Sequence, residues 1–153
     1  MSSNLARFIA TFFCVGYIPI APGTCASLVG MFFYLLFYQN MVVYVAIFVV
    51  VLFFGFLMSD LAEQSLGEKD PSCIVIDEDA GSMITFFMLP LTPSVMITAF
   101  FLFRAFDMFK IYPVNKLEDL KGGVGVMMDD VIAGVYANLL MHAALKLKDL
   151  LFI

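Results

Sequence analysis

Two pairs of adjacent carboxyl groups are the residues of this chain best suited to chemistry. Asp77 and Glu78 form one pair, Asp129 and Asp130 form the other, and both pairs lie next to apolar sequence. Acids in such surroundings are costly unless a metal ion, a proton or a basic partner neutralises them. If the two pairs face each other, four carboxylates surround one cavity, and ligation by oxygen alone suits Mg²⁺ or Mn²⁺ rather than zinc. Solvated helix ends near lipid head groups are the alternative, but ionisable residues inside membranes usually mark functional sites.

Small residues follow each acid pair by one helical turn. Successive residues of a helix are rotated by about 100°, so Asp77 and Glu78 share a face and Asp79 points roughly 200° away from Asp77. Gly81 lies one turn beyond the first pair, and Gly134 lies one turn beyond the second. Small residues at these positions let two helices, or a helix and a ligand, approach closely. The pattern therefore predicts a site shared by two helices, from which Asp79 is excluded.

Groups that can bind an anion occur in three other places. Arg104, Asp107 and Lys110 are spaced to line one stripe of a helix, where two cations can clamp a phosphate and Asp107 can orient one of them or join the metal shell. Taken alone, this stripe is better interpreted as an ordinary charge pair at a membrane interface. Thr24 lies where a helix is expected to begin, and its hydroxyl can hold an anion or simply cap the helix. The glycine cluster that includes Gly123 can bend sharply and let a ligand come close.

The elements that must position these residues are apolar. Of the 153 residues, 63% are hydrophobic and 14% are charged, and the mean hydropathy is +1.00. Soluble proteins average about 45–50% apolar and 25% charged residues. The composition indicates an integral membrane protein with a single domain over residues 1–153. The net charge of −5 argues against nucleic acid as a partner, because binding it needs clustered lysines and arginines.

Uncharged stretches broken by proline and glycine predict the helices. No alternating strand pattern is present, so we expect an all-α fold, a compact polytopic membrane bundle of five to six helices with short or broken segments. Ser59 is expected to cap a short surface helix that Gly67 ends. The basic residues around 104–121 place the loop over 104–128 in the cytoplasm by the positive-inside rule, and the final helix is expected to be short, with its topology open. The expected helices cover 4–16, 25–38, 41–58, 73–89, 94–109 and 129–147, with the short surface helix over 59–66 and a loop over 112–126.

Four motifs connect these residues to a known family. They are PGT-x-x-S from Pro22, D-E-x-x-G from Asp77, F-R-x-x-D-x-x-K from Phe103, and G-G-x-G-x-M-x-D-D-x-x-A-G from Gly122. With these motifs the chain resembles the phosphatidylglycerophosphatase A family, small bacterial membrane enzymes. The last motif is the most specific. At Asp79 the chain departs from the pattern, because the family usually has an apolar residue there.

The resemblance implies Mg²⁺-dependent hydrolysis of the phosphomonoester of phosphatidylglycerophosphate, which gives phosphatidylglycerol and phosphate. It also implies a multi-pass protein of the bacterial inner membrane with its active site at the cytoplasmic face. The expected roles are Mg²⁺ binding or water activation for Asp77, Glu78, Asp129 and Asp130, support of either shell for Asp107, and substrate binding for Thr24, Arg104, Lys110 and Gly123. A carboxylate nucleophile remains an alternative. The rival class is a non-catalytic membrane protein whose carboxylates conduct cations or protons.

Overall fold

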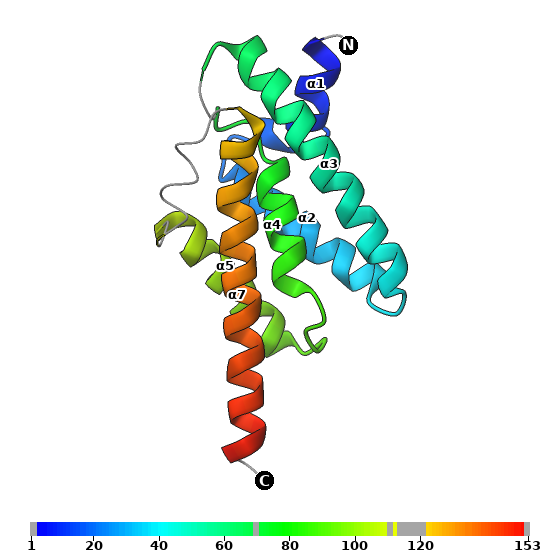
Figure 1. Ribbon diagram of the computed structural model, residues 1–153, viewed down its shortest axis with the longest axis vertical. Helices are drawn as coiled ribbons and strands as arrows, with labels where there is room; N and C mark the ends of the chain where they lie inside the picture. Colours follow the sequence, from blue (N-terminus) through cyan, green and yellow to red (C-terminus); the bar gives the residue numbers. More distant parts are fainter. Residues whose placement is uncertain (1–2, 69–70, 110–111, 113–121, 152–153) are drawn as a thin grey trace.

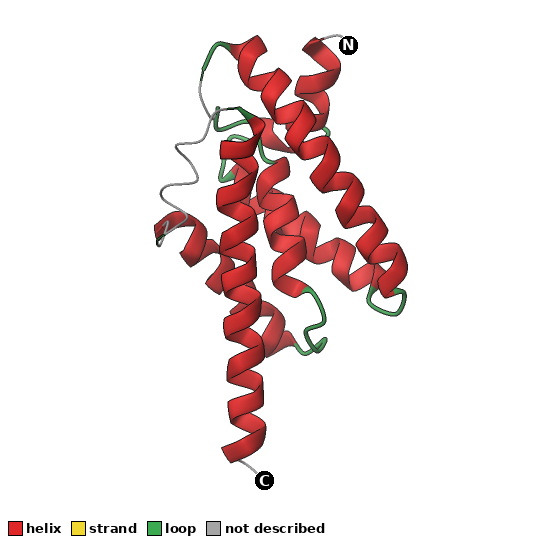
Figure 2. Ribbon diagram, viewed as in Figure 1, coloured by secondary structure: helices red, strands yellow, loops and turns green. Residues whose placement is uncertain are grey.

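Helices make up all the regular structure in the described part of the chain (Figures 1 and 2). The computed structural model describes residues 3–68, 71–109, 112 and 122–151. Within these ranges there are six α-helices, one 3₁₀ turn at Val15–Tyr17 and no strand, which confirms the predicted all-α class. The α-helices are α1 (Ser3–Ala10), α2 (Pro22–Phe37), α3 (Met41–Leu66), α4 (Ile76–Phe86), α5 (Pro93–Phe109) and α7 (Gly123–Leu151). By length and composition, α3 and α7 can each cross a membrane.

Helix α3 is longer than the sequence suggested. Asn40 caps its start, since its side-chain oxygen accepts a hydrogen bond from the Val43 N–H at 3.2 Å. Gly67 ends it in a left-handed conformation (φ 72°) and donates its N–H to the Glu63 carbonyl, as predicted. The separate surface helix capped by Ser59 is wrong, because Ser59 is buried inside the continuous helix. A drop in hydropathy does not end a helix whose backbone hydrogen bonds remain intact.

The first and last predicted helices also need correction. Helix α1 ends at Ala10 instead of continuing to residue 16, and α2 already begins at Pro22, where the fixed φ of proline suits a first helical turn. The predicted loop is wrong in its last part, because Gly123 and Gly125 belong to α7. The expectation of a short final helix is wrong as well, since α7 has 29 residues.

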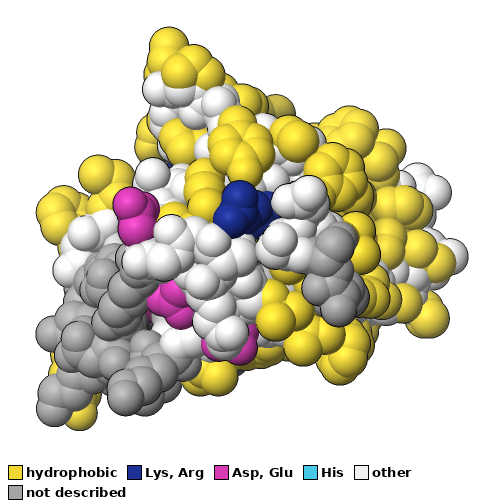
Figure 3. Space-filling model, turned by 90° about the horizontal axis from the view of Figure 1, so that it is seen from above, with side chains coloured by type: hydrophobic (Ala, Val, Ile, Leu, Met, Phe, Trp, Pro, Cys, Tyr) yellow, Lys and Arg dark blue, Asp and Glu magenta, His cyan; other side chains and the backbone are white. Residues whose placement is uncertain are grey.

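Helix α4 lies at the centre of the bundle, between α7, α3, α2 and α5 (Figure 1). Nine of its 11 residues are buried. The outer helices instead expose large apolar side chains: Val42 and Phe53 on α3 are 81% and 63% exposed, and Phe101 on α5 is 67% exposed. In the end view, hydrophobic side chains cover the flanks, whereas acidic and basic side chains lie between them (Figure 3). An apolar outer surface of this extent fits an apolar solvent such as a bilayer.

The two helices that carry the acid pairs cross in direct backbone contact. A Cβ added at Gly81 of α4 would lie 2.6 Å from the carbonyl oxygen of Asp130 in α7. A Cβ added at Gly134 of α7 would in turn overlap the carbonyl oxygen of Gly81. The structure therefore confirms that small residues one turn beyond the acids let two helices approach closely.

Candidate active site

One polar cavity of about 370 Å³ brings together side chains from α4, α5 and α7. The first turn of α4 lines it with Asp77 and Glu78, and α7 lines it just before the glycine crossing. The last turns of α5 and the start of α2 complete the lining that the helices provide. The titratable residues that line it are Asp77, Glu78, Arg104, Asp107, Asp129 and Asp130. Six of the residues singled out from sequence motifs thus line one space.

Three of these carboxyl groups converge on a single point. Asp77, Glu78 and Asp130 each offer an oxygen that lies within 4.8 Å of the other two. Within the described residues, Asp77 Oδ1, Glu78 Oε2 and Asp130 Oδ1 are buried and accept no hydrogen bond. Unsatisfied buried carboxylate oxygens are costly, and a hard divalent cation such as Mg²⁺ satisfies them. The donor set, three carboxylates and no nitrogen or sulfur, fits that ion.

Burial changes the pKa values of the two acids of α4. This helix does not itself span a bilayer, because its 11 residues extend only about 16 Å. Burial raises the pKa of the Asp77 carboxyl above its ordinary value, and the neighbouring charge of Glu78 raises it further. Burial raises the pKa of the Glu78 carboxyl as well. Such carboxyls favour a state in which a proton or a cation compensates their charge.

Arg104 of α5 supplies the cavity with a positive charge. Arg104 Nη1 forms an ion pair with Asp107 Oδ2 at 2.6 Å, one turn along the same helix. Both side chains are largely shielded from solvent but still line the cavity. Among the described lining residues Arg104 is the only cation, beside five carboxyl groups. Lys110, which was expected to extend this stripe, lies outside the described residues.

Comparison with known proteins assigns the chain to a family. The family profile described as Phosphatidylglycerophosphatase A matches residues 8–145. The chain belongs to the phosphatidylglycerophosphatase A family. This membership confirms the predicted resemblance and makes the chain a phosphatase. All four acids and the Arg104–Asp107 pair lie within the matched region.

Three curated relatives cover most of the chain. A protein of Bacteroides thetaiotaomicron named "Putative phosphatidylinositol-3-phosphatase" is 40% identical, over 93% of this chain and 94% of its own length. Proteins named "Phosphatidylglycerophosphatase A" from Escherichia coli and Haemophilus influenzae are 33% and 32% identical, over 87% and 92% of this chain and 79% and 88% of theirs. No solved structure matches the chain significantly.

Two predicted site residues of this family member lie apart from the cavity lining. Thr24 is half-buried in the first turn of α2, next to the lining residue Gly23. Gly123 packs against α3, where an added Cβ would lie 3.0 Å from the Asp60 backbone nitrogen. Gly123 thus brings the start of α7 close to α3. Asp79 is fully buried and does not line the cavity, in keeping with its angular position on α4.

Sequence reasoning missed part of the cavity wall. Ala21, Pro22 and Gly23 line it at the start of α2, and Ser72 and Ile74 line it from the connection before α4. A Cβ at Gly23 would overlap Glu78 Oε1, so this glycine lets the acid lie against α2. The Pro-Gly pair at the head of the first motif was the available signal. Nothing local in the sequence indicated that α2 would pack against α4 at this point.

Proposed function

We propose that this family member is a Mg²⁺-dependent lipid phosphatase that hydrolyses phosphatidylglycerophosphate to phosphatidylglycerol and inorganic phosphate. One observation carries the proposal: three carboxyl groups, each with a buried and unsatisfied oxygen, converge in the cavity that Arg104 also lines. A site that must hold both a cation and a phosphate needs both kinds of group. The two relatives named for this activity support the choice of lipid.

Each residue has a role that its position supports. Asp77, Glu78 and Asp130 would hold the cation, which when bound would neutralise charge on the phosphoryl oxygens. Arg104 donates hydrogen bonds to the phosphate, and Asp107 fixes the orientation of its guanidinium. Asp129 accepts the Asp130 N–H at 3.0 Å and lines the same cavity, where it can take a proton from an attacking water.

In this scheme the water oxygen forms a bond to phosphorus as the bond to the lipid glycerol oxygen breaks. The leaving oxygen takes up the proton that Asp129 accepted from the water, and phosphate and phosphatidylglycerol leave the cavity. The proposal also includes the predicted roles of Thr24, Lys110 and Gly123 in substrate binding.

The surroundings suggest how the enzyme lies in its membrane. Helices α3 and α7 are long and apolar enough to cross a bilayer, and the starts of α2 and α4 meet at the polar cavity. We place the protein in the bacterial inner membrane as a multi-pass protein, with the cavity at the cytoplasmic face. The basic residues Arg104, Lys110, Lys116 and Lys121 support that orientation.

A second head group has support from the comparisons. The Bacteroides thetaiotaomicron relative is named for a phosphatidylinositol phosphate and covers nearly the whole chain. The carboxylate cluster and Arg104 act on the phosphomonoester, which the two lipids share. The residues that contact the remainder of the head group would decide between them.

Phosphate release from purified protein tests the proposal. We expect turnover of phosphatidylglycerophosphate in detergent micelles with Mg²⁺, loss of turnover with EDTA, and recovery when Mg²⁺ is restored. Phosphatidylinositol 3-phosphate and phosphatidic acid, assayed in parallel, rank the head groups. Asp130→Asn should abolish release while the protein stays folded. Full activity of that variant, or of the EDTA-treated enzyme, refutes the metal assignment, and no turnover of any lipid by folded protein favours the cation-conducting rival.

A further inference from the structure

A second cavity lies between α2 and α5, two of the helices that border the active-site cavity. It measures about 340 Å³ and is lined by Met31 and Leu35 of α2, by Met96 and Ile97 of α5, and by the turn over 91–93. At the active site, α2 contributes Pro22 and Gly23 and α5 contributes Arg104 and Asp107. Because α2 runs away from the active site and α5 runs toward it, the two cavities lie at the two ends of one helix pair.

The separation of the two cavities matches the depth of one lipid leaflet. Met31 lies eight positions after Gly23 along α2, and Arg104 lies eight positions after Met96 along α5. At 1.5 Å per residue, each interval is about 12 Å. Half of the hydrocarbon core of a bilayer is about 15 Å thick. A lipid whose phosphate lies beside Arg104 therefore has an acyl chain long enough to reach the second cavity.

The two cavities differ in chemistry, one charged and the other apolar. The active-site end carries five carboxyl groups and a guanidinium, whereas the far end offers only aliphatic and thioether side chains apart from Thr92 and the backbone. Unbranched methionines adapt to a flexible chain. Two of the lining side chains are exposed, Leu35 by 47% and Ile97 by 57%. The far cavity is therefore open to the apolar surroundings from which a lipid would enter.

We propose that the path from Gly23 and Arg104 to Met31, Leu35, Met96 and Ile97, the α2–α5 groove, holds one acyl chain of the phosphorylated substrate lipid. The inference rests on the proposed function, which supplies a lipid phosphomonoester as the substrate. The bound chain fixes the depth and orientation of the lipid, so that its phosphate lies beside Arg104. Since a chain leaving the bilayer gains little hydrophobic free energy, the groove contributes positioning more than affinity.

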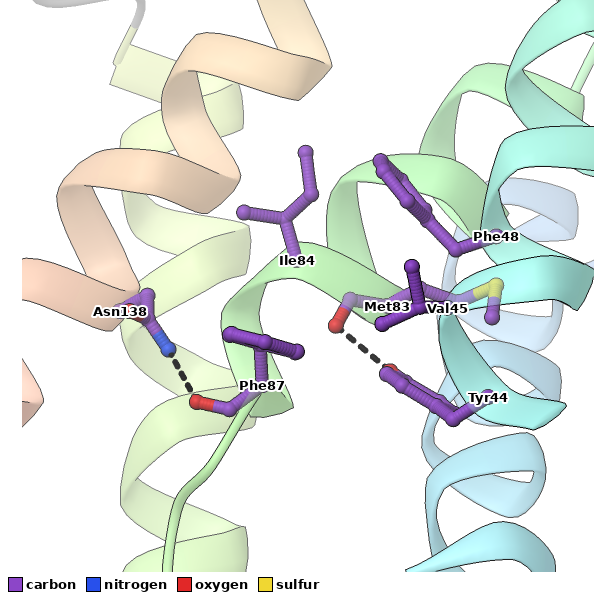
Figure 4. Close-up of a pocket in the computed structure, with 7 residues that line it drawn as sticks. All are labelled: Tyr44, Val45, Phe48, Met83, Ile84, Phe87 and Asn138. Atoms are coloured by element: carbon purple, nitrogen blue, oxygen red, sulfur yellow. Dashed lines mark hydrogen bonds between the residues drawn. The ribbon is translucent and has the colours of Figure 1, made fainter. Parts of the chain in front are cut away.

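Two other apolar cavities lie outside this helix pair. One, of about 230 Å³, lies between α3, α4 and α7 around Ile84 (Figure 4). Gly81, in backbone contact with α7, lies between this cavity and the acids along α4. The other, of about 350 Å³, lies between α1 and α3. The segment leading into α4 separates it from the active site and is held to α1 by the Val75 N–H, which donates to the Ala10 carbonyl at 3.0 Å.

Photo-crosslinking tests the groove without relying on turnover. The full chain in phosphatidylcholine vesicles is irradiated with phosphatidylglycerophosphate that carries a diazirine in the middle of one acyl chain. The control probe is phosphatidylcholine with the same chain. We expect peptides of α2 and α5 to be labelled at least fivefold more by the phosphorylated probe, and excess unlabelled phosphatidylglycerophosphate to remove that labelling. Identical labelling maps for the two probes would overturn the proposal.

A matched pair of substitutions tests the groove through kinetics. Ile97→Trp fills the α2–α5 groove, and Ile84→Trp makes the same change in the cavity of Figure 4. For substrate with sixteen-carbon chains, Ile97→Trp should lower kcat/KM about tenfold, because the displaced chain no longer holds the phosphate in position beside Arg104. For six-carbon chains, the loss should stay within twofold. Ile84→Trp should leave the ratio of the two substrates unchanged, and Leu35→Trp repeats the test from α2.

The outcomes separate this inference from the proposed function. If the phosphorylated probe labels α2 and α5 specifically but the protein releases no phosphate, the groove is supported and the phosphatase assignment is refuted. If the protein releases phosphate but both probes label it equally, the groove is refuted and the phosphatase assignment stands. An equal effect of Ile97→Trp on long and short chains also refutes the groove.

Discussion

The contact between α4 and α7 at Gly81 gives the sharpest test of the active-site geometry. Gly81 lies one turn beyond Asp77 on the same face of α4, and an added Cβ would meet the Asp130 carbonyl oxygen at 2.6 Å and Phe103 Cε2 at 2.8 Å. Ordinary van der Waals contact begins at 3.4 Å, so Gly81→Ala requires a shift of about 0.8 Å. The atom in the way belongs to the backbone of a proposed cation ligand. The substitution therefore moves Asp130 away from Asp77 and Glu78.

We expect activity to fall much more than stability. Overpacking typically costs about 1–3 kcal/mol, and replacing a helical glycine by alanine recovers about 1 kcal/mol. The net loss in the free energy of unfolding is then about 0–2 kcal/mol. A misplacement of about 1 Å in a catalytic site can lower the rate about 100-fold. Phosphate release at saturating Mg²⁺, Mg²⁺ titration and the melting temperature in detergent measure the separate effects.

Gly55→Ala is the matched control. Gly55 is also a helical glycine in close contact, but its added Cβ would meet the flexible end of Met127, with the sulfur at 2.7 Å. That side chain can rotate away without moving a backbone. We expect activity within about twofold of wild type for Gly55→Ala, since no proposed ligand moves. If Gly81→Ala is folded and equally active, the three carboxyl groups do not need the spacing that the structure gives them.

Three further predictions follow from other contacts. Arg104→Ala should lower kcat/KM about 100-fold or more, because it removes the group that donates hydrogen bonds to the phosphate. Asp107→Asn should lower kcat/KM less, about tenfold, because the guanidinium stays but loses its ion pair. Steady-state kinetics of the two variants would show this order. Tyr44→Phe removes the hydrogen bond donated to the Met83 carbonyl at 2.6 Å, so it should cost about 1 kcal/mol in thermal unfolding with activity unchanged. Mg²⁺ at 100 times its dissociation constant should stabilise the folded protein by about 2.7 kcal/mol, and Asp130→Asn should lose that shift in melting temperature.

The acid pairs were predictable because helix geometry is local. Once Asp77-Glu78 and Asp129-Asp130 are placed on helices, rotation by about 100° per residue decides which neighbours share their face. The same rule placed Gly81 and Gly134 where the two helices meet, and it put Asp79 elsewhere. No knowledge of the packing was needed for these conclusions.

The remaining part of the site depended on contacts distant in sequence. The wall formed by Ala21 and Gly23 exists because α2 packs against α4, about 55 residues away along the chain. Glycine has a low helix propensity, so the cluster before Asp129 was predicted to be a loop. At Gly123 tertiary packing overrides that propensity, because only a residue without a Cβ fits against the backbone of α3. Ser59 misled for a related reason, since a buried polar residue inside a helix resembles a helix cap when only the sequence is known.

The placement of the helix ends explains how one cavity can hold many acids and still receive a phosphate. Asp77 and Glu78 lie in the first turn of α4, and the start of α2 lines the same cavity at Pro22 and Gly23. Helix N-termini carry partial positive charge, which stabilises carboxylates and attracts phosphate. Together with Arg104, these two helix ends give the cavity the means to hold an anion beside the proposed cation. A path that only conducts cations has no use for such positive potential, and this contrast favours phosphoryl transfer over cation passage.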